Sequence, residues 1–160
     1  VSCTQAVRNM GMTPTKQVIM ANILTADKKR AKALNLSDTD QVFQLGRVLY
    51  ANGEPLNYTL TYLALKLFPR LEEHDFGKES LYMVLSEEYH VNITKARRTV
   101  EAVLVKDEIA EYLDIEAKMP VILFGCTTYG EVNGQEIPIE NFKCYYRTDK
   151  YKFYIDQVAQ

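Results

Sequence analysis

Apolar residues recur along the chain at two spacings, one typical of short helices and the other typical of strands. Near the start, positions 3, 6, 7 and 10 are apolar at the spacing of one helical face, and a glycine follows at position 11. Runs rich in β-branched and apolar residues instead favour extended strands. The predicted helices cover residues 2–10, 27–34, 80–89 and 107–113, and the predicted single strands cover residues 17–25, 93–105 and 152–158.

A longer pattern occurs twice. Residues 42–62 contain a glycine followed four residues later by a tyrosine, then an Asn-Gly pair, a proline and a final tyrosine, and residues 121–146 contain the same features in the same order. Asn-Gly pairs favour tight hairpin turns because such turns need positive φ angles. The sequence therefore predicts an α+β fold in which an antiparallel sheet, built from two pseudo-duplicated hairpins, is flanked by helices.

Composition and charge narrow the class of protein. With 47% hydrophobic and 25% charged residues, the chain is typical of a folded domain and not of a disordered one. No apolar run approaches the length of about 18 residues that a membrane span requires, so we expect no membrane contact. A formal net charge of −2 lacks the positive excess that attracts a phosphate backbone, so we do not expect this chain alone to hold DNA.

The sequence contains no convincing catalytic or metal-binding pattern. His74 and His90 are separated by a whole predicted helix, and neither lies at a spacing used by nucleophilic or metal sites. Cys3, Cys126 and Cys144 form neither a metal spacing nor an even set, which favours reduced thiols in a cytoplasmic protein, with Cys126 and Cys144 in the core. We therefore predict a protein that is not an enzyme and that binds no metal and no cofactor.

Two predicted helix starts and one strand carry residues suited to an anion. Ser80 begins one helix, and Ser2 and Thr4 lie at the start of another, where free backbone amides favour a phosphate or carboxylate. Arg47 interrupts an otherwise apolar strand, and a buried guanidinium is costly unless an anion pairs with it. An ion pair with an internal acid, or a side chain that points to solvent, would account for Arg47 equally well.

Glu140 and Glu101 are the acids considered as partners of Arg47. Glu140 also lies six residues before Tyr146 in a predicted strand, so alternation puts their side chains on the same face. A carboxylate that accepts hydroxyl protons and a tyrosine that stacks or donates suit a sugar-like ligand. A cross-strand pair and a core tyrosine explain the same two residues without a ligand.

Several segments, taken in order, resemble one known protein family. They are Ser2-x-Thr4, Gly11-Met12-Thr13-Pro14, Leu34-x-Leu36-Ser37, Arg47 to Pro55, Leu67-Phe68-Pro69, Ser80-Leu81-Tyr82, Thr99 to Ala102, Leu113-x-Ile115 and Tyr145-Tyr146-Arg147-x-Asp149-x-Tyr151. These segments look like the effector-binding domain, called the UTRA domain, of bacterial transcription regulators of the GntR type and HutC subfamily. The resemblance extends over nearly the whole chain.

The resemblance implies a fold, partners and a place in a larger protein. The fold is expected to be like that of chorismate lyase, with residues 1–160 forming one small-molecule-sensing domain that makes a homodimer in the cytoplasm. A winged-helix DNA-binding domain is expected upstream of Val1, which is not an initiator methionine. Operator DNA would then be bound only through that preceding domain, and an effector in a cleft above the sheet would change the affinity for the operator.

The resemblance also implies which residues hold the effector. Relatives that sense phosphosugars hold the anion with an early Ser/Thr segment, arginines of the first hairpin and the serine that begins the middle helix. The corresponding ligand-binding residues here are Ser2, Thr4, Arg47, Ser80, Tyr82, Glu140 and Tyr146. Leu49 stands where the family has a second arginine, and Thr59 where it often has an acid. A phosphosugar, a neutral sugar and an organic acid are therefore all candidate effectors.

Two other functions fit the same fold. A lyase-type enzyme would need an acid or base with a shifted pKa, and Glu101 and Glu140 are the candidates. A ligand-independent dimerisation module would need Arg47 to be neutralised inside the protein. The surroundings of Arg47 distinguish the sensor from the dimerisation module.

Overall fold

The computed structural model describes residues 3–159, and one antiparallel sheet forms its centre. The strands are β1 (Pro14–Thr25), β2 (Gln41–Ala51), β3 (Glu54–Ala64), β4 (Asn92–Leu104), β5 (Pro120–Val132) and β6 (Gln135–Tyr146). They lie side by side in the order β1-β2-β3-β6-β5-β4. The helices are α1 (Cys3–Asn9), α2 (Lys28–Ala33), α3 (Leu81–Glu87) and α4 (Asp107–Leu113), and the short 3-10 turns are η1 (Leu65–Leu67) and η2 (Leu71–Glu73).

Each half of the sheet repeats the same order of elements. β1, α2, β2 and β3 form the first half, β4, α4, β5 and β6 form the second, and β3 pairs with β6 where the halves meet. Both hairpin turns are Asn-Gly pairs with positive φ angles, 50° and 82° at Asn52 and Gly53, and 52° and 78° at Asn133 and Gly134. The predicted α+β fold with two pseudo-duplicated hairpins is confirmed.

The glycine that both hairpins share has a packing role. A Cβ atom on Gly46 would lie 2.8 Å from Cγ of Met20 and 2.9 Å from the Tyr58 hydroxyl oxygen. A Cβ atom on Gly125 would lie 2.6 Å from Oγ1 of Thr99. Since side chains of the neighbouring elements already fill this space, both first strands of the hairpins need a residue without a side chain.

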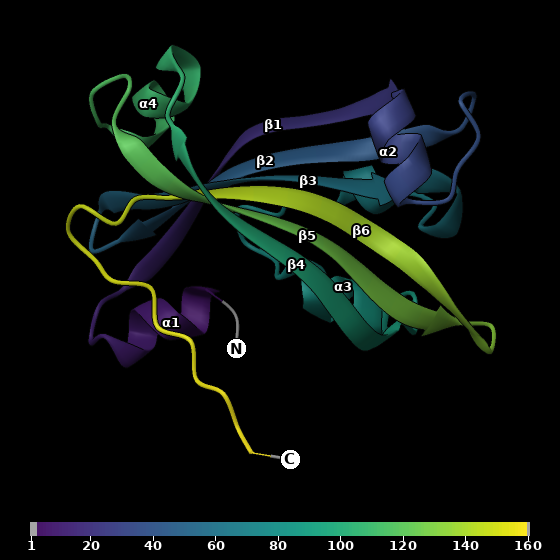
Figure 1. Ribbon diagram of the computed structural model, residues 1–160. Coiled ribbons are helices and arrows are strands. Elements are labelled where there is room, and N and C mark those ends of the chain that lie inside the picture. Colours follow the sequence, from purple (N-terminus) through teal and green to yellow (C-terminus); the bar gives the residue numbers. More distant parts are fainter. Residues whose placement is uncertain (1–2, 160) are drawn as a thin grey trace.

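The four helices cover both faces of the sheet. Figure 1 shows α2 and α4 above the sheet and α1 and α3 below it. α2 begins after Asp27, whose side chain accepts a hydrogen bond from the amide of Arg30, and Ala31 and Leu34 then pack against Val42 of the sheet. No helix within residues 3–159 is long and apolar enough to cross a membrane.

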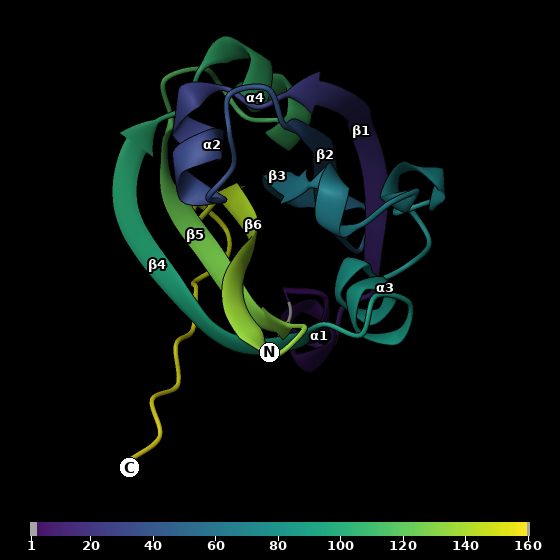
Figure 2. The ribbon, with the colours of Figure 1, turned by 90° about the vertical axis from the view of Figure 1, so that its right-hand side faces the viewer.

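We call the face of the sheet that α1 and α3 cover the lower face. The apolar core on this face is divided into two clusters, one beside α1 and one beside α3. The α1 cluster contains the buried residues Val7, Leu49, Ala51, Leu56, Phe124, Cys144 and Tyr146. The α3 cluster contains Phe43, Leu45, Leu63, Phe68, Leu71, Phe76, Leu81, Val84, Leu85, Val91 and Ile139. Figure 2 shows from the side that α1 and α3 lie at the end of the molecule opposite α2 and α4.

The cysteines match their predicted role. Cys126 and Cys144 are buried, Cys3 is exposed, and all three are free thiols. Burial raises the pKa of the Cys144 thiol to about 12. This thiol is therefore protonated at neutral pH, and a protonated thiol is a poor nucleophile.

The strand predicted for residues 152–158 is not formed, so that prediction is wrong. The chain leaves the sheet after Tyr146, and Arg147 holds the exit through a two-point ion pair with Asp149, at 2.8 and 2.9 Å. Residues 152–159 then extend beyond the body of the protein without a neighbouring strand (Figures 1 and 2). Alternating apolar residues favour an extended backbone, but they do not supply the hydrogen-bonding partner that a strand requires.

Candidate functional site

A group of polar side chains lies on the lower face of the sheet, next to α3. Strand pairing and alternation put them on this face, because Arg47 lies opposite Thr59, Thr59 opposite Cys144, and Glu140 opposite Thr128. Tyr82 reaches the same group from α3. The lower-face site, as we define it, consists of Arg47, Tyr82, Thr128 and Glu140 together with the neighbouring cations Lys16 and Arg98.

Glu140 is the buried acid of the lower-face site. The residue is 1% exposed, and its Oε1 accepts hydrogen bonds from the Tyr82 hydroxyl and, at 2.9 Å, from the Thr128 hydroxyl. Burial raises the pKa of the Glu140 carboxyl, and the two hydrogen bonds and the charges of Arg47 and Arg98 offset only part of this shift. Glu140 is therefore a buried polar group that two hydroxyls hold in one orientation.

Arg47 is partly buried and incompletely paired. Its Nη1 donates one long hydrogen bond of 3.5 Å to the carbonyl of Phe76. No carboxylate in residues 3–159 lies within 4 Å of its guanidinium, so the ion pair with Glu101 or Glu140 that the sequence left open is not formed. Burial lowers the pKa of Arg47, and the charges of Glu140 and Tyr82 oppose that shift. A guanidinium has five N–H donors, and the described protein accepts only this one hydrogen bond from Arg47.

Two further cations, which the sequence analysis missed, add positive charge to the site. Lys16 of β1 lies opposite Leu49, two residues along β2 from Arg47 and on the same face of the sheet. Burial and the charges of Arg47 and Arg8 lower the pKa of Lys16. Arg98 of β4 lies opposite Cys126 and acts electrostatically on Glu140. The order of the strands, which no local signal in the sequence reveals, brings Lys16 near Arg47 and Arg98 near Glu140. Positive charge of this kind attracts an anion.

The residues predicted at the two helix starts lie at or beyond the edge of the lower-face site. Ser80 is the N-cap of α3 and accepts a 3.4 Å hydrogen bond from the amide of Met83. It therefore positions the helix that carries Tyr82. Thr4 lies in the first turn of α1, and no hydrogen bond in the described chain joins it to the site. Ser2 lies outside the described residues.

Tyr146 shares a face with Glu140, as alternation predicts, but the structure does not bring the two side chains together. Six residues of extended strand separate them by about 20 Å. The Tyr146 ring instead packs edge-on against Phe124 and Phe153, with centroids 6.3 and 5.2 Å apart. Its surroundings are those of a core tyrosine in the α1 cluster.

The two positions that depart from the family pattern have different surroundings. Leu49 is buried in the α1 cluster, where a charged side chain would have to displace apolar neighbours. Thr59 is partly buried next to Arg47, directly across the strand pair. Lys16 of β1 and Arg98 of β4 add positive charge close to Arg47 and Glu140, respectively.

His74 secures the loop before α3. Its Nδ1 lies 3.1 Å from Oε1 of Glu79, and its Nε2 contacts Oε2 of Glu88. Burial lowers the pKa of His74, but the hydrogen bonds and charges of the two glutamates raise it more, so the net shift is upward. Within residues 3–159, no three His, Cys, Asp or Glu side chains are grouped so that they could hold a metal ion.

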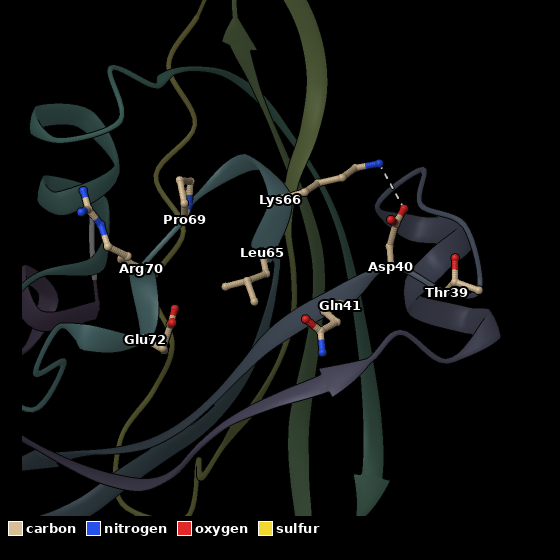
Figure 3. Close-up of a pocket in the computed structure, with 8 residues that line it drawn as sticks. All are labelled: Thr39, Asp40, Gln41, Leu65, Lys66, Pro69, Arg70 and Glu72. Atoms are coloured by element: carbon tan, nitrogen blue, oxygen red, sulfur yellow. Dashed lines mark hydrogen bonds and ion pairs between the residues drawn. The ribbon is translucent and has the colours of Figure 1, made fainter.

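A hollow elsewhere on the surface is lined by none of the predicted site residues. Figure 3 shows its wall around the loop that leads into β2 and the segment from η1 to η2, and its volume is about 510 Å³. Asp40 and Lys66 of this wall form an ion pair of 3.1 Å. The lining residues are Thr39, Asp40, Gln41, Leu65, Lys66, Pro69, Arg70 and Glu72. Because a paired surface cation attracts an anion less than Arg47 does, the lower-face site is the stronger candidate.

Replacing Glu140 tests the consequences of its burial. We expect Glu140→Ala to lower the free energy of unfolding by about 1–3 kcal/mol, because the hydroxyls of Tyr82 and Thr128 lose their common acceptor. Glu140→Gln keeps an acceptor and should cost less. A raised carboxyl pKa means that the folded protein binds this proton more tightly than the unfolded chain does. The stability of the wild type should therefore fall as pH rises from the ordinary carboxyl pKa through the raised one.

The Gln variant has no such proton, so this part of the pH dependence should be missing from it. Urea unfolding of wild type, Glu140→Gln and Glu140→Ala at about pH 5 and about pH 8 measures both effects. Identical pH profiles for wild type and Glu140→Gln would contradict the upward pKa shift. The comparison between variants also cancels the contribution of His74, which is the same in all three proteins.

Three comparisons relate the chain to known proteins. A family model described as the UTRA domain matches residues 9–152. The HTH-type transcriptional repressor NagR of Bacillus subtilis (strain 168) is 28% identical over 99% of this chain and 64% of its own length. The HTH-type transcriptional repressor PhnF of Mycolicibacterium smegmatis is 26% identical over 95% of this chain and 61% of its own length.

A solved structure shows the same fold. The crystal structure of the effector domain of PhnF from Mycobacterium smegmatis superposes with a TM-score of 0.89 at 26% identity, covering 99% of this chain and 95% of that one. The chain spans less than two thirds of the length of the curated relatives NagR and PhnF.

Proposed function

This chain belongs to the UTRA domain family, and from that premise we propose that it is the effector-sensing domain of a bacterial transcription regulator of the GntR type and HutC subfamily. It binds a small anionic metabolite at the lower-face site. As part of a cytoplasmic homodimer, it changes the affinity of a preceding winged-helix domain for operator DNA. Both curated relatives are named as transcriptional repressors, which supports a regulatory role over a lyase activity.

The observation that carries this proposal is the state of Arg47. The guanidinium is partly buried, has no carboxylate within 4 Å in residues 3–159, and donates only one long hydrogen bond to the described protein. Partial burial without a counterion is costly, and an anionic ligand supplies the missing partner. A dimerisation module without a ligand would have no need of such a group.

The groups around Arg47 favour an anion that also carries hydroxyls. Lys16 and Arg98 add positive charge, which suits a phosphate or carboxylate. Glu140 accepts hydrogen bonds, and the hydroxyls of Tyr82 and Thr128 both donate and accept them, which suits a sugar. A phosphosugar therefore satisfies more of the site than a neutral sugar or a plain organic acid.

Binding would couple to regulation through α3. Tyr82 belongs to this helix, whereas Arg47 and Glu140 belong to the sheet, so a ligand that contacts all three favours one position of the helix. A ligand shifts such an equilibrium only by binding one arrangement more tightly than the other. The same shift in two protomers would change the spacing of the attached DNA-binding domains on a two-fold operator.

Thermal unfolding in the presence of added compounds tests the proposed sensor. Hexose 6-phosphates, the matching neutral hexoses and small dicarboxylates form the panel. A compound that binds only the folded state adds about 2.7 kcal/mol at 100 times its Kd, which should raise Tm by roughly 5–10 °C for a chain of this size. We expect hexose phosphates to raise Tm and neutral hexoses to raise it less.

Lys66→Ala tests whether the shift in Tm comes from the surface hollow in Figure 3 and not from the lower-face site. This variant removes a cation from the hollow and should leave the shift in Tm unchanged. If no compound raises Tm while the dimer persists, the dimerisation module replaces the sensor as the better hypothesis. Chemical conversion of a bound compound would instead support the lyase.

A further inference from the structure

The upper face of the sheet, which α2 and α4 cover, carries a group of cations that the lower-face site does not use. α2 lies against β6 on this face (Figure 2). The sequence of α2 is Lys-Lys-Arg-Ala-Lys-Ala, and two of its residues, Arg30 and Ala31, are buried. A basic run on a helix is ordinarily a solvated surface, and an arginine is rarely buried without a partner.

Arg30 is the buried cation of this group. The residue is 9% exposed, and its guanidinium carbon lies 4.5 Å from the centroid of the Tyr62 ring. Its Nε is buried without a hydrogen-bond partner, and no carboxylate of residues 3–159 lies within 4 Å of the guanidinium. The face of an aromatic ring attracts a cation, but it does not replace the hydrogen bonds that a guanidinium forms in water.

Lys143 is a second cation on the same face. Tyr62 of β3 lies opposite Asn141 of β6, and Lys143 follows Asn141 by two residues. Alternation therefore makes Lys143 a diagonal neighbour of Tyr62, at a distance that long side chains can span. The β5 residue opposite Lys143 is Gly125, which has no side chain with which the ammonium could pair.

The charges around Lys143 are not balanced within the described chain. Burial and the charges of Lys29 and Arg30 lower the pKa of Lys143, and the charge of Glu101 only opposes this shift. Neither Lys29 nor Lys143 has a carboxylate of residues 3–159 within 4 Å. Uncompensated positive charge in one place attracts an anion.

We propose that Arg30 and Lys143, with Lys29 beside them, bind the phosphate groups of a second small molecule on the upper face of the sheet. A guanidinium offers forked donors and an ammonium offers a point charge, and phosphates use both. The hydroxyl of Thr127 accepts a 3.0 Å hydrogen bond from Nδ2 of Asn141, so it keeps its own proton to donate. Several cations in one place favour a ligand with more than one phosphate charge.

This upper-face site is separate from the lower-face site and does not depend on it. Thr59, which lies opposite Arg47, is three residues from Tyr62 along β3, so alternation puts the two sites on opposite faces. A small molecule suits the upper-face site better than a nucleic-acid backbone does. Backbone phosphates contact cations on an exposed surface, whereas Arg30 is covered by its own helix and the Tyr62 ring.

Calorimetric titration with inorganic pyrophosphate tests the upper-face site. Arg47→Ala serves as the parent protein, because it lacks the guanidinium of the lower-face site. We expect this parent to bind pyrophosphate. Adding Lys143→Met, which keeps the aliphatic stem and removes the charge, should weaken binding by about 10- to 100-fold, since one hydrogen bond to a charged group is lost.

A matched control comes from the same helix. Lys28 is an exposed cation of α2, two residues before Arg30 and therefore on another side of the helix. Lys28→Ala in the Arg47→Ala parent should bind pyrophosphate as the parent does. Arg30→Met keeps an apolar stem beside Tyr62 and should weaken binding as Lys143→Met does, with circular dichroism to check that it folds.

Nuclear magnetic resonance locates the bound anion. In the Arg47→Ala parent, the Nε–H resonance of Arg30 should shift as pyrophosphate is added. The proposal is wrong if this parent does not bind pyrophosphate, if the Arg30 resonance stays in place, or if Lys143→Met and Lys28→Ala bind equally well. Tighter binding of a short DNA duplex than of pyrophosphate, at equal phosphate concentration, would assign the cations to nucleic acid and also overturn it. None of these results would alter the case for the lower-face site.

Discussion

Arg47→Ala is expected to weaken the binding of a hexose phosphate by about 10- to 100-fold. The guanidinium would donate hydrogen bonds to the phosphate, and a hydrogen bond to a charged group contributes about 1.5–3 kcal/mol. Within residues 3–159 the side chain forms no ion pair and one 3.5 Å hydrogen bond, so its removal should change the free energy of unfolding little. Calorimetric titration of wild type and variant with the same hexose phosphate measures the loss.

Two controls accompany this substitution. Arg47→Lys keeps the charge but loses the planar donor arrangement that matches a phosphate, so its affinity should lie between those of wild type and Arg47→Ala. Lys66→Ala changes a cation of the surface hollow and should bind as the wild type does. Equal affinities of Arg47→Ala and wild type would show that the phosphate binds somewhere other than the lower-face site.

Phe76→Ala is expected to lower the free energy of unfolding by about 3–5 kcal/mol. Phe76 is buried in the α3 cluster, and its ring lies 6.1 Å from that of Phe43 between centroids. The residue belongs to the long segment between β3 and α3, and its carbonyl is the hydrogen-bond acceptor of Arg47. Urea unfolding measures the loss of stability, and titration of the folded variant should also show weaker binding of the hexose phosphate.

A graded substitution checks the cause of this effect. Phe76→Leu keeps much of the apolar volume and should be clearly more stable than Phe76→Ala, because the cavity left behind is smaller. If the two variants unfold at the same urea concentration, the ring does not anchor this segment. If Phe76→Ala binds the hexose phosphate as tightly as the wild type, the Phe76 carbonyl does not help to position Arg47.

The elements of the fold were largely predictable from local patterns. Asn52-Gly53 and Asn133-Gly134 indicate hairpin turns because their backbone conformation is local, and the structure shows both with positive φ angles. The repeated glycine at Gly46 and Gly125 was visible as a pattern, although its packing reason depends on Met20, Tyr58 and Thr99 in neighbouring elements.

The candidate site was predictable only in part. Arg47 was recognised because a charge within an apolar strand is unusual, and Glu140 because of its position in the second hairpin. Thr128 was missed, since only the pairing of β5 with β6 brings it to Glu140. Lys16 and Arg98 were missed for the same reason, because each lies in a strand that is distant from Arg47 along the chain.

Local patterns in the chain were enough to establish most of the helices and strands, the two hairpins and the presence of a cationic side chain in an apolar strand of one of them. These features depend on backbone preferences and hydrophobic spacing, which act over a few residues. Only the assembled sheet packs the Tyr146 ring against Phe124, leaves Arg47 without a carboxylate partner, and keeps residues 152–158 from forming a strand within the chain. Each of these outcomes depends on which strands become neighbours, and neighbours are chosen by the packing of the whole sheet.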